Sequence, residues 1–115
     1  MGSELDRAFE ALADPTRRGV IRALREEPLR AGELAEALST TRPAMSKHLR
    51  VLREAGLVEE RSDDADARAR VYQLRREPFT ELRAWLDDVE GFWTDQLAAF
   101  QAHVAARAAK GGPKR

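Results

Sequence analysis

The residues best suited to chemistry in this sequence form a basic run between Thr41 and Arg53. The run contains three arginines, one lysine and no acid, although the chain as a whole has 20 basic and 20 acidic residues. If the run is helical, Met45, Leu49 and Leu52 share one face and meet the core. The opposite face then carries the side chains Arg42, Ser46, Lys47 and Arg50. Basic and hydroxyl side chains bind phosphates and base edges, so this helix is predicted to contact double-stranded DNA.

Basic residues on a helix are often ordinary solvated charges, so the prediction depends on the elements around them. Thr41 is expected to cap the helix first and to lie near a phosphate second. For His48, packing or a hydrogen bond at the helix edge is as good an interpretation as a DNA contact. The predicted DNA-binding residues are Thr40, Thr41, Arg42, Pro43, Ser46, Lys47, His48, Arg50, Arg61, Arg68 and Arg70.

Three aspartates interrupt the basic residues that follow the helix. Asp63, Asp64 and Asp66 lie between Arg61 and Arg68, where they would repel phosphates. The arginines near the strands are therefore expected to contribute more to DNA binding than the loop between them. A separate hypothesis gives Arg30, at the start of a predicted helix, a contact with a DNA phosphate.

Two short helices are predicted at the start of the chain. Apolar residues recur at helical spacing in the first of them: Leu5, Phe9 and Leu12. Asp14 and Pro15 begin the second, because Asp accepts amide hydrogens at an N-cap and Pro has none to lose. Its arginines, Arg17 and Arg18 among them, are expected to point mostly outward.

The next elements are predicted to form a winged helix-turn-helix. A short helix over residues 32–38 is followed, after about three residues, by the basic helix over 41–55. Gly56 is well placed as a left-handed C-cap. Two strands, 57–62 and 68–74, then form a hairpin, which is the wing. The predicted fold class is mainly α with this small β-hairpin.

A last, long helix is predicted from Pro78 to about Ala109. Its apolar stripe from Phe79 to Val104 would be about 39 Å long. The first helix and the domain body would cover only part of such a stripe, so dimerisation through the first and last helices is the better interpretation. The residues assigned to this interface are Leu5, Phe9, Leu12, Leu82, Trp85, Leu86, Val89, Phe92, Trp93, Leu97, Phe100 and Val104.

Composition excludes several classes of protein. The 115 residues contain no cysteine, so disulfides, thiolate metal sites and cysteine nucleophiles are ruled out. No signal peptide or membrane span is evident, and a cytoplasmic location is expected. One domain over residues 1–110 with a disordered tail at 111–115 is predicted. No phosphate loop or nucleophile–base set is present, so neither an enzyme nor a cofactor is expected.

Several stretches together resemble the ArsR/SmtB-type winged-helix transcriptional regulators, over roughly residues 5–104. The first of these stretches is Ala11-Leu12-Ala13-Asp14-Pro15-Thr16-Arg17-Arg18. The others run over residues 32–38, 43–58 and 70–74. The resemblance implies a homodimer formed by the first and last helices. It also implies repression of the protein's own or adjacent genes through a palindromic operator.

The resemblance also bears on metal sensing. Metal-sensing members often carry a cysteine pair where this sequence has Arg30 and Gly32, and the last helix offers only His103 with scattered acids. The sequence is therefore similar to the cysteine-free branch, and no metal is expected. Two alternatives stay open: a winged-helix module that binds a protein, and a metal-responsive repressor of the same family. Whether a small molecule controls the protein is left undecided.

Overall fold

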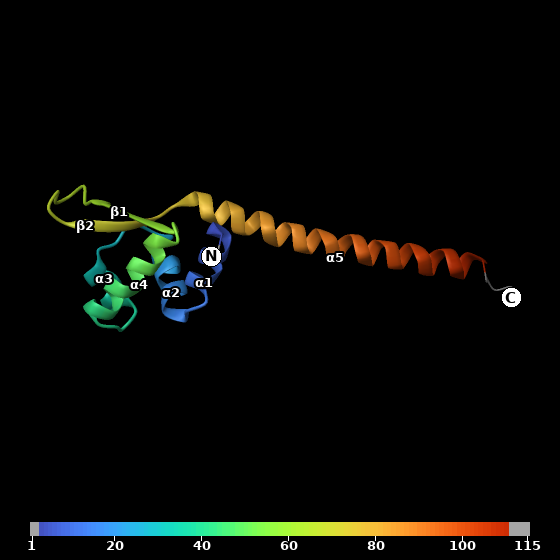
Figure 1. The fold of residues 1–115 in the computed structure, drawn as a ribbon, viewed down its shortest axis with the longest axis horizontal. Helices are drawn as coiled ribbons and strands as arrows, with labels where there is room; N and C mark the ends of the chain where they lie inside the picture. Colours follow the sequence, from blue (N-terminus) through green and yellow to red (C-terminus); the bar gives the residue numbers. More distant parts are fainter. Residues whose placement is uncertain (1–2, 111–115) are drawn as a thin grey trace. The chain divides into compact units, whose positions relative to one another are not determined.

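The computed structural model describes residues 3–110, so the tail predicted at 111–115 lies outside the described residues. Within this range the chain forms five helices and one antiparallel hairpin (Figure 1). Residues up to Leu82 make up one compact unit and those from Arg83 onward a second. The elements are α1 (Glu4–Leu12), α2 (Pro15–Leu24), α3 (Ala31–Ala37), α4 (Arg42–Glu54), β1 (Val58–Ser62), β2 (Arg70–Leu74) and α5 (Arg76–Lys110).

The junction of α1 and α2 follows the local signals in the sequence. Asp14 caps α2 by accepting a hydrogen bond of 3.0 Å from the backbone N–H of Arg17, and Pro15 is the first helical residue. The predicted apolar stripe of α1 is only partly buried, since Leu5 and Leu12 are half-buried and Phe9 is exposed. The fully buried side chains of this helix are the small Ala8 and Ala11. Small residues at these positions allow α1 to approach the rest of the unit closely.

The core of the first unit lies between the helices and the hairpin. The predicted inner face of α4 is confirmed, since Met45, Leu49 and Leu52 are all at most 1% exposed. They pack in one cluster with buried side chains of the other elements: Val20, Leu24, Leu34, Leu57, Val58 and Leu82. Burial of one face fixes which face of α4 is left for solvent.

Helix α4 ends in a Schellman motif. The N–H of Gly56 donates to the carbonyl of Arg53, and the N–H of Leu57 donates to that of Leu52, at 2.9 and 3.0 Å. Gly56 has φ +77°, a conformation that costs other residues about 1–2 kcal/mol. The predicted left-handed C-cap is therefore confirmed.

Gly56→Ala is expected to destabilise the fold by about 1–2 kcal/mol, because Ala must adopt the left-handed conformation. Gly91→Ala is the matched control. Nothing lies within 4 Å of a Cβ at that helical position, so the substitution should stabilise α5 by up to about 1 kcal/mol. Urea denaturation followed by circular dichroism measures both. Equal effects of the two substitutions would contradict this account of Gly56.

The hairpin is anchored to the helix-turn-helix by a pairing that the sequence did not reveal. Strands β1 and β2 pair from Val58–Leu74 to Ser62–Arg70. Leu29, just before α3, forms a bridge with Tyr72 through hydrogen bonds of 3.2 and 2.8 Å. The segment that leads into α3 is therefore held at the edge of the wing.

Helix α5 begins two residues before and ends one residue after the predicted 78–109. Its residues from Arg83 onward belong to the second unit. Large apolar side chains along it are strongly exposed, including Trp93 at 68% and Phe100 at 63%. None of the helices within residues 3–110 is long and apolar enough to cross a membrane.

Candidate nucleic-acid interface

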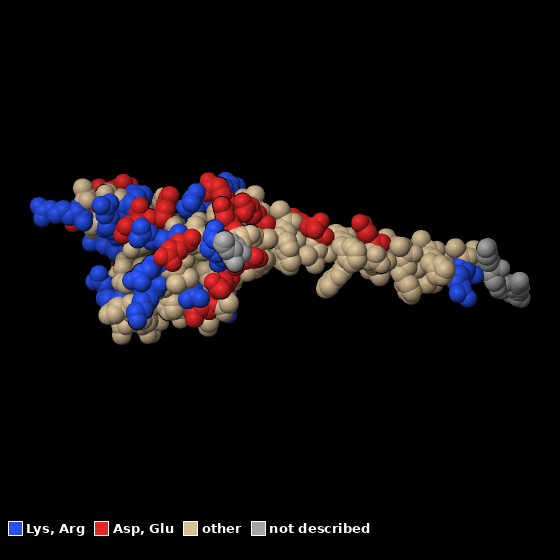
Figure 2. All heavy atoms as spheres, viewed as in Figure 1, with Lys and Arg blue, Asp and Glu red and all other residues tan. Residues whose placement is uncertain are grey.

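The outer face of α4 carries the side chains that the sequence assigned to DNA. Arg42, Ser46, Lys47 and Arg50 are all exposed. Thr41 caps the helix, since its hydroxyl accepts a hydrogen bond of 3.2 Å from the N–H of Ala44. Figure 2 shows that Lys and Arg side chains gather on the compact unit, whereas the visible face of the α5 segment is mostly uncharged.

The cations of this face are available to a ligand. No hydrogen bond or ion pair within residues 3–110 engages the side chains of Arg42, Lys47 or Arg50. The guanidinium of Arg42 instead lies over α3, 3.4 Å from the position that a Cβ would take on Gly32. Unpaired exposed cations contribute little to folding, so they suit a binding role.

A groove runs between α3, the outer face of α4 and the wing. Its volume is about 660 Å³. Three arginines line it, one from each wall: Arg30 before α3, Arg42 of α4 and Arg70 of β2. Ser46 lies beside them, and the acids Glu33, Glu36 and Glu60 complete the charged lining. The groove thus joins the predicted wing contacts to the predicted α4 contacts.

The turn between α3 and α4 holds its threonines in different ways. Ser39 adopts φ 53°, which is unusual for a residue other than glycine. The backbone N–H of Thr40 then donates to the carbonyl of Ala35 at 2.9 Å. Thr40 is half-buried while Thr41 and Pro43 are exposed at the start of α4.

His48 faces the α1–α2 junction. Its Nδ1 lies 3.5 Å from Nη1 of Arg17 and 3.9 Å from Oδ2 of Asp14. A guanidinium can only donate, so the Arg17 contact is a hydrogen bond where Nδ1 of His48 carries no hydrogen. The structure therefore places the His48 ring at the helix edge, beside Arg17 and Asp14. A DNA contact by His48 stays a prediction.

Arg17 connects three helices, and the expectation that it points outward is wrong. Its Nε donates to the carbonyl of Ala11 at 2.6 Å and its Nη2 to that of Glu10 at 3.4 Å, so it satisfies the end of α1. Nη1 reaches His48 of α4. No local signal marks Arg17 for this role, because its partners lie on other elements.

The wing arginines are held by the wing itself. Nε of Arg61 donates to Gln73 at 2.8 Å, and Nη1 of Arg70 donates to the hydroxyl of Ser62 at 3.2 Å. Arg68 is exposed in the loop. These bonds orient Arg61 and Arg70 along the hairpin.

Two of the three wing aspartates are paired with arginines. Oδ2 of Asp63 accepts from Nε and Nη2 of Arg30 at 3.0 and 2.7 Å. Oδ1 of Asp64 lies 3.2 Å from Nη1 of Arg61. The wing loop is therefore less repulsive to phosphates than its composition indicates. The Arg30 hydrogen bonds, followed by one from the N–H of Ala65, lower the pKa of Asp63.

The lowered pKa of Asp63 predicts an acid-dependent loss of stability. The folded-state pKa of Asp63 lies below the ordinary value of 3.8. The contribution of Asp63 to the free energy of unfolding is therefore fully present above pH 3.8 and is lost as the pH falls through the folded-state pKa. We expect Asp63→Asn to lower Tm by no more than a few degrees at pH 7, and by less at an acidic pH below 3.8. Thermal melts at both pH values test this. Asp66→Asn is the control, and a Tm difference for Asp63→Asn that persists undiminished at low pH would contradict the prediction.

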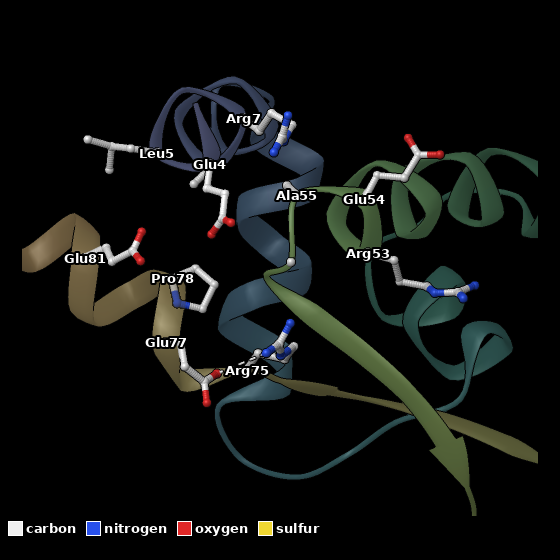
Figure 3. Close-up of a pocket in the computed structure, with 12 residues that line it drawn as sticks. Glu4, Leu5, Arg7, Arg53, Glu54, Ala55, Arg75, Glu77, Pro78 and Glu81 are labelled. Atoms are coloured by element: carbon white, nitrogen blue, oxygen red, sulfur yellow. Dashed lines mark ion pairs between the residues drawn. The ribbon is translucent and has the colours of Figure 1, made fainter. Parts of the chain in front are cut away.

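A second pocket, of about 290 Å³, lies where α1, the end of α4 and the start of α5 meet (Figure 3). Figure 3 shows the carboxylates of Glu4 and Glu81 on either side of Pro78, with the Arg75–Glu77 ion pair below them. Acids and bases both line the pocket, which favours neither a phosphate nor a bare cation. No group of three or more potential metal ligands occurs within the described part of the chain.

Comparisons with known proteins agree with this architecture. The helix-turn-helix domain model matches residues 12–61. The HTH-type transcriptional regulator Rv2034 of Mycobacterium tuberculosis is 48% identical over 95 residues, which are 83% of this chain and 83% of that protein. The transcriptional repressor SdpR of Bacillus subtilis is 33% identical over 54 residues, which cover 47% of this chain and 60% of SdpR.

A solved structure supports the same assignment. The crystal structure of the ArsR family transcriptional regulator RHA00566 is similar with a TM-score of 0.71 and 34% identity, over 80% of this chain and 98% of that one. A match over four-fifths of this chain extends well beyond a single motif. With α3, α4 and the β1–β2 hairpin in the winged helix-turn-helix arrangement, the chain belongs to the ArsR family of DNA-binding transcriptional regulators, which are not enzymes.

Proposed function

We propose that this regulator is a homodimeric repressor that binds a palindromic operator beside its own or an adjacent gene, in the cytoplasm. Helix α4 enters the major groove, and the wing lies on the neighbouring backbone or minor groove. Arg42 and Lys47 donate to base edges, Ser46 to a base or a phosphate, and Arg50 to the backbone. No metal or cofactor is part of this proposal.

The observation that carries the proposal is the division of α4 into two faces. Met45, Leu49 and Leu52 are buried to 1% exposure or less, which fixes the orientation of the helix. Lys47 and Arg50 on the other face are exposed, and they are without hydrogen bonds or ion pairs in the described residues. A recognition helix needs an anchored back and free donors in front.

The apolar side chains of α5 support the dimer. Leu86, Phe92, Trp93, Leu97, Phe100 and Val104 are between 47% and 68% exposed. Apolar side chains in a row along a helix mark a surface that binds another protein. A second copy offers the same stripe, and two-fold symmetry matches a palindromic site with half-sites about 34–36 Å apart. The proposal assigns Leu5, Phe9 and Leu12 of α1 to the same interface.

The proposal that this protein represses transcription, rather than activating it, draws on one of its relatives. SdpR, by its name a transcriptional repressor, matches about half of this chain. A dimer bound across a promoter blocks polymerase without needing any further domain. Repression is therefore the simplest outcome of operator binding by this chain.

Fluorescence anisotropy with two labelled duplexes tests the proposal. One duplex carries the region upstream of the gene, the other the same bases in scrambled order, and both are titrated over a salt series. We expect the upstream duplex to bind at least about 1000-fold more tightly, with a negative slope of log K against log salt. Equal affinity for both duplexes would reject sequence-specific binding.

A further inference from the structure

The side chain of Arg30 is bound to a carboxylate of the wing. Oδ2 of Asp63 accepts hydrogen bonds from both Nε and Nη2 of Arg30. A carboxylate and a phosphate present similar oxygens to a guanidinium. The arginine side chain is still 43% exposed, so a phosphate can reach it from solvent.

The wing holds Asp63 in place for this contact. Its Oδ1 accepts from the N–H of Ala65 at 3.0 Å, and its own N–H donates to the carbonyl of Ala69 at 3.0 Å. One carboxylate oxygen thus closes the turn while the other binds Arg30. The aspartate is presented at a high effective concentration to a single arginine.

Arg30 also belongs to the groove that faces the proposed DNA. It lines the groove with Arg42 and Ser46 of α4 and Arg70 of β2. Glu33, the acid nearest in sequence, is engaged elsewhere, since it accepts a hydrogen bond of 2.8 Å from the backbone N–H of Arg30. Within residues 3–110, Asp63 is the one acid that forms an ion pair with the Arg30 side chain.

We propose that the groove contains a phosphate-binding site at Arg30, and that Asp63 occupies this site in the free protein as an internal substitute for a DNA phosphate. The inference rests on the proposed DNA binding. To contact Arg30, a DNA strand must displace the Asp63 carboxylate. The exchange replaces one anion at Arg30 by another, so this contact adds little affinity for any duplex, and recognition depends more on the base contacts of α4.

A double-mutant cycle separates this competition from a general effect of charge. Asp63→Asn removes the charge but keeps an oxygen that can close the turn. Asp66→Asn is its matched control, because Oδ1 of Asp66 likewise accepts a backbone N–H, from Arg68 at 3.0 Å, and Asp66 forms no ion pair in the described residues. Arg30→Gln is made alone and together with each of them. Cooperative melting curves with Tm values within a few degrees of the wild type verify that all variants fold.

Each protein is titrated with the upstream and the scrambled duplex over the salt series. We expect Asp63→Asn to tighten binding to both duplexes about 10-fold near 0.1 M salt and to steepen the salt slope by about 0.9, the value for one added phosphate contact. Asp66→Asn should tighten binding only about 2-fold through its lost charge. In the Arg30→Gln background, Asp63→Asn should have no more effect than Asp66→Asn.

Two results of the mutant cycle would overturn the inference. Weaker binding by Asp63→Asn would mean that the ion pair serves to hold the wing in a binding conformation. An effect of Asp63→Asn that is unchanged by Arg30→Gln would mean that only its charge matters. The mutant cycle can also behave as expected while the protein binds the upstream and the scrambled duplex equally well. That outcome would reject the proposed function and leave the inference standing. Absence of binding to either duplex would reject both.

Discussion

Leu97→Glu should convert the proposed dimer into a monomer and weaken binding to the proposed two-half-site operator by at least about 100-fold. The Leu97 side chain is 56% exposed in the middle of the α5 stripe. In a dimer interface, a carboxylate at this position would be buried without a partner, at a cost of several kcal/mol. A monomer binds one half-site and loses the second, intramolecular binding event, which is worth about 100–10,000-fold.

Sedimentation equilibrium and operator titration measure the two effects of this substitution. Ala102→Glu is the matched control, since it places the same charge five residues away and outside the stripe. It should leave both the mass and the DNA affinity unchanged. The Phe100 side chain is 63% exposed in the same stripe. Phe100→Glu should therefore repeat the effect of Leu97→Glu. A dimeric Leu97→Glu protein with wild-type DNA affinity would show that α5 is not the interface.

Lys47→Ala should weaken binding to the upstream duplex by about 10–100-fold, the loss of about 1–3 kcal/mol of a good base or backbone contact. Lys47 is exposed on α4, and no ion pair in the described residues compensates its charge. The fold should not suffer, because the substitution removes no packing and Ala favours a helix.

The salt series shows which contact Lys47 makes. A base contact predicts a greater loss on the upstream than on the scrambled duplex, and a phosphate contact predicts equal losses with a slope shallower by about 0.9. Arg22→Ala is the control, because it removes an exposed positive charge from the last turn of α2, outside the proposed interface. Wild-type affinity in Lys47→Ala would contradict the assignment of this face to DNA.

Local patterns were sufficient to predict much of this protein. The three-and-four spacing of Met45, Leu49 and Leu52 identified the buried face of α4, and burial on one side of a helix determines what remains outside. Thr41 and Gly56 marked its two ends through cap chemistry, which depends only on neighbouring residues. The helix, the turn before it and the hairpin after it were therefore readable in order along the chain.

Contacts between distant residues were decided only by the tertiary structure. Arg17 and His48 are 31 residues apart, and Arg30 and Asp63 are 33 apart. Periodicity says that an arginine lies on a surface, but not which carbonyl, ring or carboxylate the fold brings beside it. The wing acids illustrate the difference, since their composition predicted repulsion of phosphates and the fold pairs Asp63 with the distant Arg30.

The helix-turn-helix, its wing and the basic face of α4 can be predicted from the amino-acid sequence, because caps, turns and hydrophobic periodicity are local properties of the chain. The tertiary structure alone decided the bridge from Leu29 to Tyr72, the role of Arg17 at the end of α1 and the occupancy of Arg30 by Asp63. The physical reason is that a side chain's partner depends on how elements pack, and packing is set by the whole core rather than by any one segment.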